Sequence, residues 1–189
     1  IHTLAEAMKD ADAFLGLSVA DVVTPDMLKS MAPKPIVFAL ANPQPEISYE
    51  AAMDSRDDII MATGRSDYPN QINNVIGFPY IFRGALDCQA TGINDTMKIA
   101  AVHAIADLAK EPVPSIVDDA YGDVSISFGR DYILPKALDP RLLTRVAPAV
   151  AKAAMESGTA RRQIEDFDSY REHLSKLMGD RGQLMRHIS

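Results

Sequence analysis

Three short apolar runs, separated by segments with helix signals, constrain the fold of this chain more than any other feature. The runs are AFLGLS at 13–18, PIVFALA at 35–41 and DIIMAT at 58–63. Continuous apolar runs of this length are typical of strands that are buried on both faces. A spacing of about 20 residues leaves room for a crossover helix, which favours parallel strands with right-handed connections. The alternation therefore predicts an α/β fold in which the strands are parallel, adjacent and covered by helices.

Helix signals lie between the runs and after them. TPDMLKSM at 24–31 has a Thr cap, a Pro at the first helical position and an Asp in the first turn. Beyond the third run, the polar loop GRSDYPNQINN leads into a largely helical region. The segment 112–139 is interrupted by Pro and Gly, and we assign no structure to it. We expect the other helices over 3–10, 46–54, 77–87, 94–111, 140–157 and 166–178.

Composition argues against several functional classes. The net charge is −7 with no basic stripe, which argues against nucleic-acid binding. Apolar runs fall short of the roughly 18–20 residues of a membrane span, so we expect no membrane partner. The single cysteine, Cys88, fits a reducing compartment, and we expect a cytoplasmic location. The chain starts at Ile1 and opens as if within a structural unit, so we expect it to be a fragment of a longer polypeptide.

The residues that end the three runs predict a binding edge. In open parallel sheets, ligands bind outside the carboxyl ends of the strands. Gly16 and Gly64 have no Cβ, so a flat ring or a ribose can approach the backbone there. Asn42 precedes Pro43, which favours an extended backbone from which the amide can project as donor and acceptor. The alternative is ordinary turn composition, because loops are rich in Gly, Pro and polar residues in any case.

Asn73 and Asn74 lie shortly before the helix expected over 77–87. A helix N-terminus offers free N–H groups and positive dipole character, which suit an anionic ligand. The alternative interpretation of this pair is local turn and cap chemistry.

Several chemical motifs are absent from the sequence. No G-x-G-x-x-G motif is present, so the usual pyrophosphate-binding loop is missing. The four histidines, at positions 2, 103, 173 and 187, are far apart and have no metal-ligand spacing. No Ser or Cys lies in a nucleophile elbow. We therefore expect no catalytic residue and no metal ligand within this chain.

The block ATGRSDYPNQINNVIGFPYIFRGALD at 62–87 closely resembles the malic enzyme family, specifically the bacterial type often fused to a phosphotransacetylase-like domain. The resemblance extends over most of the chain, through blocks at 39–47, 93–109, 128–143 and 146–158. It implies the second half of a doubly wound, Rossmann-like parallel sheet, followed by a helical tail. The implied domains are a partial dinucleotide-binding domain over 1–158 and a C-terminal helical extension over 159–189.

The resemblance also implies an activity, which is NAD(P)-dependent oxidative decarboxylation of L-malate to pyruvate and CO₂. It implies that Asn42 and Asn74 contact substrate or nicotinamide, with Asn73 alongside. The residues implied for the coenzyme cleft are Gly16, Ser18, Asn42, Gly64, Arg65, Asn73 and Asn74.

Family members carry their catalytic Tyr and Lys, their acidic metal ligands and the glycine-rich loop nearer the N-terminus, and this chain has none of these. The resemblance therefore implies NAD or NADP as coenzyme and a Mg²⁺ or Mn²⁺ ion bound by residues outside this chain. The implied partners are L-malate and the rest of the same polypeptide or a complementary chain. We also expect a homo-oligomer.

Two other functions stay open. The chain could be a stand-alone α/β module that binds a nucleotide or a partner without catalysis, or part of another Rossmann dehydrogenase. A strand followed by G-x-G-x-x-G upstream of Ile1 would favour the enzyme. The block GRSDYPNQINN argues against another dehydrogenase, by family likeness alone.

Overall fold

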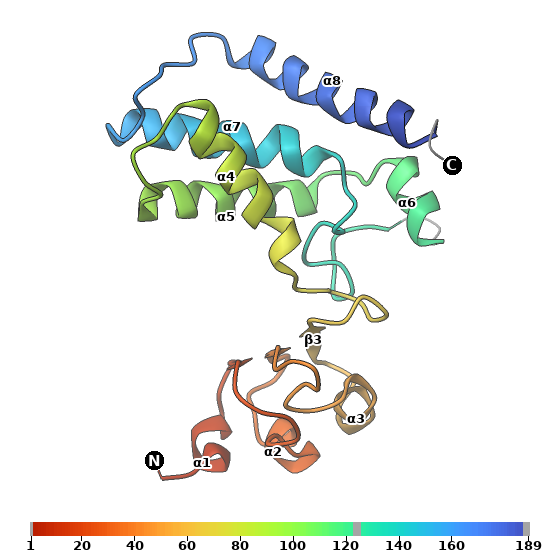
Figure 1. The fold of residues 1–189 in the computed structure, drawn as a ribbon. Coiled ribbons are helices and arrows are strands. Elements are labelled where there is room, and N and C mark those ends of the chain that lie inside the picture. Colours follow the sequence, from red (N-terminus) through yellow and green to blue (C-terminus); the bar gives the residue numbers. More distant parts are fainter. Residues whose placement is uncertain (1, 123–125, 187–189) are drawn as a thin grey trace. The chain divides into compact units, whose positions relative to one another are not determined.

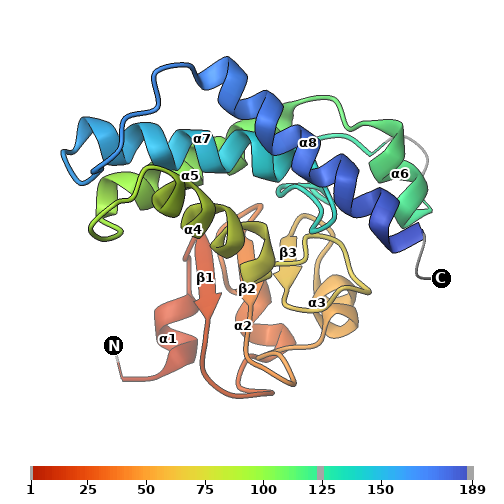
Figure 2. The ribbon, with the colours of Figure 1, turned by 45° about the horizontal axis from the view of Figure 1, so that its top comes forward.

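A computed structural model of the chain describes residues 2–122 and 126–186. These residues form two compact units, whose helices and strands are labelled across Figures 1 and 2. The first unit comprises the chain up to Asn73 together with Phe128–Leu134, and the second comprises the rest. The expected domain boundary between residues 158 and 159 stays a prediction.

The first unit contains a parallel three-stranded sheet (Figure 2). The strands are β1 (Ala13–Gly16), β2 (Ile36–Ala39) and β3 (Ile60–Thr63), in the order β1-β2-β3. Each lies within one of the three apolar runs, which confirms the expected α/β fold with parallel, adjacent strands. The register pairs Gly16 with Ala39, and Ala39 with Thr63, so the carboxyl ends of the strands form one row.

Three capped helices accompany this sheet. They are α1 (Leu4–Met8), α2 (Pro25–Lys29) and α3 (Tyr49–Ser55), and α2 contacts both of the others. The side chains of the N-cap residues Thr3, Thr24 and Ser48 each accept a hydrogen bond from the N–H three residues later. The helices share a core with one face of the sheet, built from side chains such as Leu28, Val37, Ala52 and Met61. On the opposite face, Leu15 and Ile36 are 63% and 40% exposed.

The start of α3 differs from the expected helix over 46–54. The helix begins at Tyr49 because the Ser48 hydroxyl accepts a hydrogen bond from the Ala51 N–H, at 3.2 Å. Residues 46–48 therefore remain outside the helix, with Ser48 as its cap. This start leaves Glu46 in the connection between β2 and α3, where its side chain is buried.

The second unit is helical and has α7 at its centre (Figures 1 and 2). α7 contacts α4, α5 and α8, and its Leu142, Val146 and Val150 side chains are fully buried. Gly84 lets α4 approach α7 closely, because a Cβ there would lie 2.4 Å from the Ala147 carbonyl oxygen. The helices of the second unit are α4 (Phe78–Asp87), α5 (Asp95–Lys110), α6 (Ser115–Tyr121), α7 (Arg141–Glu156) and α8 (Phe167–Arg186), preceded by the short 3₁₀ helix η1 (Asn74–Ile76).

The helices expected over 77–87, 94–111 and 140–157 are all present. The last helix is longer than expected, because α8 runs to Arg186 rather than ending at residue 178. The segment left unassigned contains α6 and an isolated bridge between Gly129 and Tyr132.

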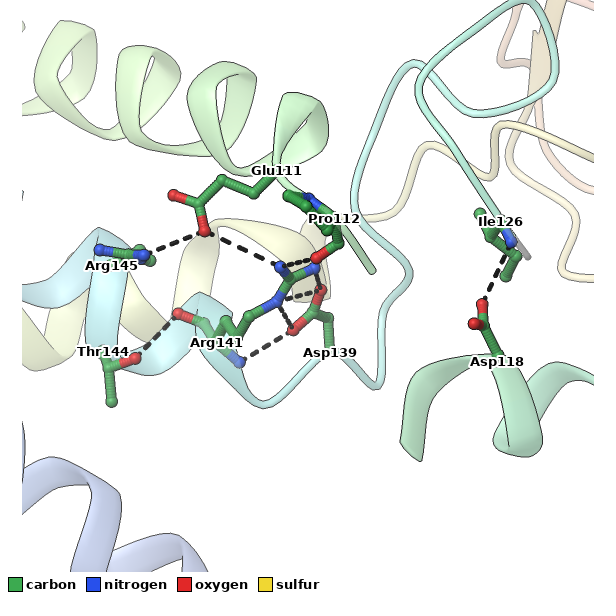
Figure 3. A network of polar contacts seen from close by, with 8 residues as sticks. All are labelled: Glu111, Pro112, Asp118, Ile126, Asp139, Arg141, Thr144 and Arg145. Carbon is green, nitrogen blue, oxygen red and sulfur yellow. Dashed lines mark hydrogen bonds and ion pairs between the residues drawn. The ribbon is translucent and has the colours of Figure 1, made fainter. Parts of the chain in front are cut away.

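A buried ion pair holds the start of α7 (Figure 3). The Asp139 side chain is fully buried, and its Oδ2 lies 2.7 Å from Nη2 of Arg141. Arg141 also donates to the Pro112 carbonyl at 2.8 Å, while Glu111 pairs with Arg145 at 2.9 Å. These contacts join the end of α5 to the start of α7.

Candidate functional site

The carboxyl ends of the three strands form the candidate site. Gly16, Ala39 and Thr63 are paired across the sheet, so the segments that follow them leave the sheet at the same edge. These segments contain Ser18, Asn42 and Gly64–Arg65, the residues that the sequence singled out. A parallel sheet offers its ligand-binding crevice at this edge.

A buried carboxylate joins the first two of these segments. Oε1 of Glu46 accepts a hydrogen bond from the Ser18 N–H at 2.8 Å, and Oε2 accepts one from the Ala41 N–H at 3.0 Å. Glu46 is 0% exposed. Sequence reasoning missed this residue because it counted Glu46 as the first residue of a helix.

Glu46 also explains why position 16 is a glycine. A Cβ at Gly16 would lie 2.4 Å from Cδ of Glu46, closer than side chains can approach. The Glu46 carboxylate fills the space where a Cβ of residue 16 would lie. The expectation that a ring or ribose occupies that space is therefore wrong. Contact between the coenzyme and the backbone of Gly16, or with the exposed Ser18, stays a prediction.

Gly64 has the open space that the sequence predicted. The nearest atom to a Cβ built at Gly64 is the Ile72 carbonyl oxygen, at 3.9 Å. Its φ angle is not positive, so other residues can adopt this backbone. The chain then returns to β3, where the Ile72 N–H donates to the Thr63 carbonyl at 2.8 Å. Gly64 is exposed and uncrowded, as a residue that faces a ligand should be.

Asn42 follows the central strand, and its side chain is exposed. The peptide bond between Asn42 and Pro43 is cis. Because β2 lies between β1 and β3, this amide follows the middle of the three strand ends. A neutral amide can donate to a carboxylate and accept from a hydroxyl, which matches a hydroxy acid.

Arg65 lies in a cluster of side chains that the sequence did not predict. Its guanidinium pairs with Asp67, with Nη2 and Oδ2 2.5 Å apart, and lies 5.2 Å from the centre of the Tyr68 ring. Tyr68 stacks on Tyr49 with ring centres 4.6 Å apart, and its hydroxyl donates to Glu50. The hydrogen bonds from Arg65 hold the pKa of the Asp67 carboxyl below its usual range. A coenzyme phosphate would compete with Asp67 for this guanidinium, and a coenzyme contact at Arg65 stays a prediction.

The paired asparagines are both exposed. Asn73 ends the first segment of the first unit, and Asn74 begins the second unit and its helix η1. Neither residue caps α4, because the N-cap position there is Gly77 and no side chain caps that helix. Capping of α4 by this pair is therefore wrong, while local turn chemistry and a ligand contact both stay predictions.

Asn70 is a buried residue that sequence reasoning also missed. Its Nδ2 donates to the Met61 carbonyl at 3.0 Å and to the Arg130 carbonyl at 2.7 Å. Its Oδ1 accepts a hydrogen bond from the Ile133 N–H at 2.9 Å. This amide ties 128–134 to β3, which explains why a distant segment belongs to the first unit.

Residues 2–122 and 126–186 contain neither a metal-binding cluster nor a membrane-spanning helix. No group of three or more His, Cys, Asp or Glu side chains in these ranges could hold a metal ion. His187 lies outside the described residues. Over the same ranges, no helix has both the length and the apolar character needed to cross a membrane.

A pocket of about 580 Å³ lies in the second unit, beside α4 and α8. Two of its lining residues, Arg83 and Tyr170, both donate to Oδ2 of Asp87, at 2.7 and 2.5 Å. Burial, together with the bond to Asp87, raises the pKa of the Tyr170 hydroxyl. These groups satisfy one another within the fold, so the pocket is a weaker candidate than the strand ends.

Comparison with known proteins identifies the family. The family model described as malic enzyme, NAD binding domain, matches residues 2–118, more than half of the chain. The chain belongs to the malic enzyme family. The NADP-dependent malic enzyme of Haemophilus influenzae is 56% identical over 185 residues, which cover 98% of this chain and 24% of that protein. The NAD-dependent malic enzyme of Rhizobium meliloti is 52% identical over 187 residues, covering 99% of this chain and 24% of that protein.

Solved structures of malic enzymes are also similar. The Pyrococcus horikoshii malic enzyme superposes with a TM-score of 0.82 at 40% identity, covering 97% of this chain and 39% of that one. The Entamoeba histolytica malic enzyme superposes with a TM-score of 0.84 at 34% identity, covering 100% of this chain and 37% of that one. The expected family and the Rossmann-like α/β fold are thus confirmed. The chain spans about a quarter of the length of curated relatives such as the Haemophilus influenzae protein, of which it covers 24%.

Proposed function

We propose that this chain forms the substrate-facing and nicotinamide-facing edge of an NAD(P)-dependent malic enzyme, which converts L-malate to pyruvate and CO₂. The observation that carries the proposal is the row formed by Gly16, Ala39 and Thr63, which places three strand ends at one edge. The exposed amide of Asn42 follows the middle strand of that row. Membership of the malic enzyme family supports the same reaction.

In this proposal the chain binds and orients, and it transfers no proton. The Asn42 amide hydrogen-bonds the carboxylate or hydroxyl of malate, while contact of Asn74 with substrate or nicotinamide stays a separate prediction. Gly64 leaves the space in which the coenzyme lies against the backbone. Bound NAD(P)⁺ supplies the acceptor for the hydride that leaves C2 of malate. Orientation of this kind raises the rate because the reacting groups are already aligned when the substrate binds.

In this proposal, the groups that bind the metal and transfer protons lie outside this chain. The described residues do not fit a metal ion, since no cluster of three potential ligands occurs among them. We therefore assign the Mg²⁺ or Mn²⁺ ligands, the general base and the pyrophosphate-binding loop to polypeptide outside these 189 residues. A homo-oligomeric state and a cytoplasmic location stay predictions.

The test uses the full-length protein, by which we mean this chain within a polypeptide as long as its relatives. Reduction of NAD⁺ and of NADP⁺ is followed at saturating L-malate with Mn²⁺, and pyruvate is measured at the end. We expect malate-dependent reduction with equimolar pyruvate, and the ratio of the two coenzyme rates gives the coenzyme preference. Turnover of an amino acid but not of malate would favour another dehydrogenase. Nucleotide binding without turnover would favour a binding module.

A further inference from the structure

The carboxylate of Glu46 is buried at the strand ends, and it has no cationic partner among residues 2–122 and 126–186. Both of its hydrogen bonds come from backbone N–H groups, and the ion pairs among the described residues do not include it. Removing a carboxylate from water is costly unless it is paired or hydrogen-bonded. A buried charge is also a poor source of net stability compared with an apolar side chain of similar size. Its location therefore calls for an explanation beyond stability.

The two N–H groups belong to the two segments that carry the expected ligand contacts. One is that of Ser18 itself, and the other is that of Ala41, the residue immediately before Asn42. Hydrogen bonds to a charged acceptor are short and directional, so they restrict both backbones more than neutral contacts would. One side chain thus sets the distance between the β1 and β2 ends.

The backbone of Glu46 is itself held in place. Its carbonyl accepts a hydrogen bond from the Val23 N–H at 3.0 Å, and the Pro45 carbonyl accepts one from the Asp21 N–H at 3.2 Å. The carboxylate therefore extends from an anchored segment into the space that Gly16 leaves open.

We propose that Glu46 is a positioning residue that holds the Ser18 and Asn42 segments at the separation needed for substrate and coenzyme. Gly16 is its structural complement, because only a residue without a Cβ leaves room for the carboxylate. This proposal rests on the malic enzyme function proposed above, and it adds to that function a residue that touches neither ligand.

The first experiment is Glu46→Gln in the full-length protein. Glutamine keeps the shape but offers one acceptor atom, so its NH₂ group faces one of the two N–H donors without a bond. We expect kcat/KM for malate to fall by roughly 10- to 100-fold, as displacement of a binding group by about 1 Å can produce. Amide hydrogen exchange should become faster in peptides that contain Ser18 and Ala41. The matched control is Glu6→Gln, an exposed carboxylate in the same unit, which should change neither quantity.

The second experiment separates positioning from a general loss of stability. Gly16→Ala alone places a Cβ against the carboxylate and should lower kcat/KM to a similar extent. In a Glu46→Ala background the carboxylate is gone, so adding Gly16→Ala should have little further effect on kcat/KM or on exchange. If Gly16 were needed for close approach of the coenzyme, Gly16→Ala would raise the coenzyme KM equally in both backgrounds.

The outcomes distinguish this proposal from the proposed function. If the unaltered protein does not oxidise malate, the function is wrong, while the exchange rates still report whether Glu46 holds the two segments. If the unaltered protein is active and Glu46→Gln matches it in kcat/KM and exchange, the positioning role is wrong. The positioning role is also wrong if Glu46→Gln lowers activity only because less of the protein is folded, so that kcat/KM per folded molecule is unchanged.

Discussion

Three positions in this chain are occupied by glycine for three different physical reasons. Gly16 makes room for the carboxylate of Glu46, and Gly84 makes room for the backbone of α7. At Gly64 the nearest neighbour of a Cβ would be a carbonyl oxygen at 3.9 Å, so the space beside it is open. Of the three, Gly64 is the one whose side-chain space is free for a ligand.

Gly64→Val is therefore expected to raise the KM for the coenzyme in the full-length protein, with little change in thermal stability. A branched side chain would occupy the space that a ribose or ring needs, and the backbone angle at this position allows the substitution. Gly92→Val is the matched control, because Gly92 is also exposed, with nothing within 4 Å of a Cβ. Steady-state kinetics with varied coenzyme measures the effect. An equal KM in both variants would make Gly64 a turn residue only.

Asn42→Ala and Asn74→Ala should each lower kcat/KM for malate by roughly 10- to 1000-fold, since a hydrogen bond to a charged or reacting group contributes about 1.5–4 kcal/mol. Both side chains are exposed, so the unfolding temperature should change little. Gln44→Ala is the control, because it removes another exposed amide two residues from Asn42. It should change neither kcat/KM for malate nor the unfolding temperature. A loss of stability in parallel with the loss of activity would instead indicate that these amides serve the local fold.

At the scale of elements, an arginine joins α2 to the start of β3. Nη1 of Arg56 donates to the Leu28 carbonyl at 2.7 Å, and Nη2 donates to the Ala32 carbonyl at 3.0 Å. The same guanidinium binds Asp58, whose other contact is the Lys34 N–H at 2.7 Å. The Leu28 carbonyl lies in the last turn of α2, and Ala32 lies just after that helix, so the guanidinium fixes the segment that follows α2. They lie at the amino end of β3, at the opposite end of the sheet from the candidate site.

This contact predicts a pH-dependent stability. Hydrogen bonds from Arg56 and from the Lys34 N–H lower the pKa of Asp58 in the folded protein. A carboxyl whose folded pKa is lowered stabilises the fold above its unfolded pKa of about 3.9, and this contribution is lost as the pH falls towards the folded pKa. Asp58→Asn should therefore lower the unfolding temperature of the full-length protein at pH 7. The difference from the unaltered protein should shrink below about pH 4.

Scanning calorimetry between pH 3 and 7 measures this difference in unfolding temperature. The range of about pH 3 to 7 extends to both sides of the unfolded pKa of the carboxyl, which is about 3.9. Asp26→Asn is the control, because Asp26 forms an exposed pair with Lys29 at 3.9 Å and such pairs contribute little. A deficit for Asp58→Asn that is constant across the range would show that the contact acts through shape and not through charge.

At the scale of the whole molecule, the chain forms two units whose order in the sequence is interleaved. The first unit takes residues up to Asn73 and then Phe128–Leu134, which returns to bind Asn70. β1 lies at one edge of the sheet and pairs only with β2 among the described strands. In β1 and the segment after it, Leu15, Leu17 and Val19 are 63%, 72% and 62% exposed. An apolar sheet edge of this kind favours association.

Residues 1–189 on their own should therefore not oxidise malate, and they should associate in a concentration-dependent way. The reason for the first expectation is that the described residues hold no metal site and the sequence has no glycine-rich phosphate loop. The isolated chain is assayed with L-malate, NAD⁺ or NADP⁺ and Mn²⁺, and its mass is followed by light scattering during gel filtration. Clear malate-dependent turnover would show that the base and the metal ligands lie within this sequence.

The sequence alone determined most of the elements, and it predicted the edge at which the candidate site lies. Strand, helix and cap signals act over a few neighbouring residues, so the apolar runs located β1, β2 and β3 and the Thr24 cap marked the start of α2. Only the tertiary structure decided which side chains meet at that edge. Glu46 binds the N–H of Ser18, 28 residues away, and Asn70 binds the carbonyl of Arg130, 60 residues away. Such contacts depend on which distant segments pack together, so a pattern of neighbouring residues does not predict them.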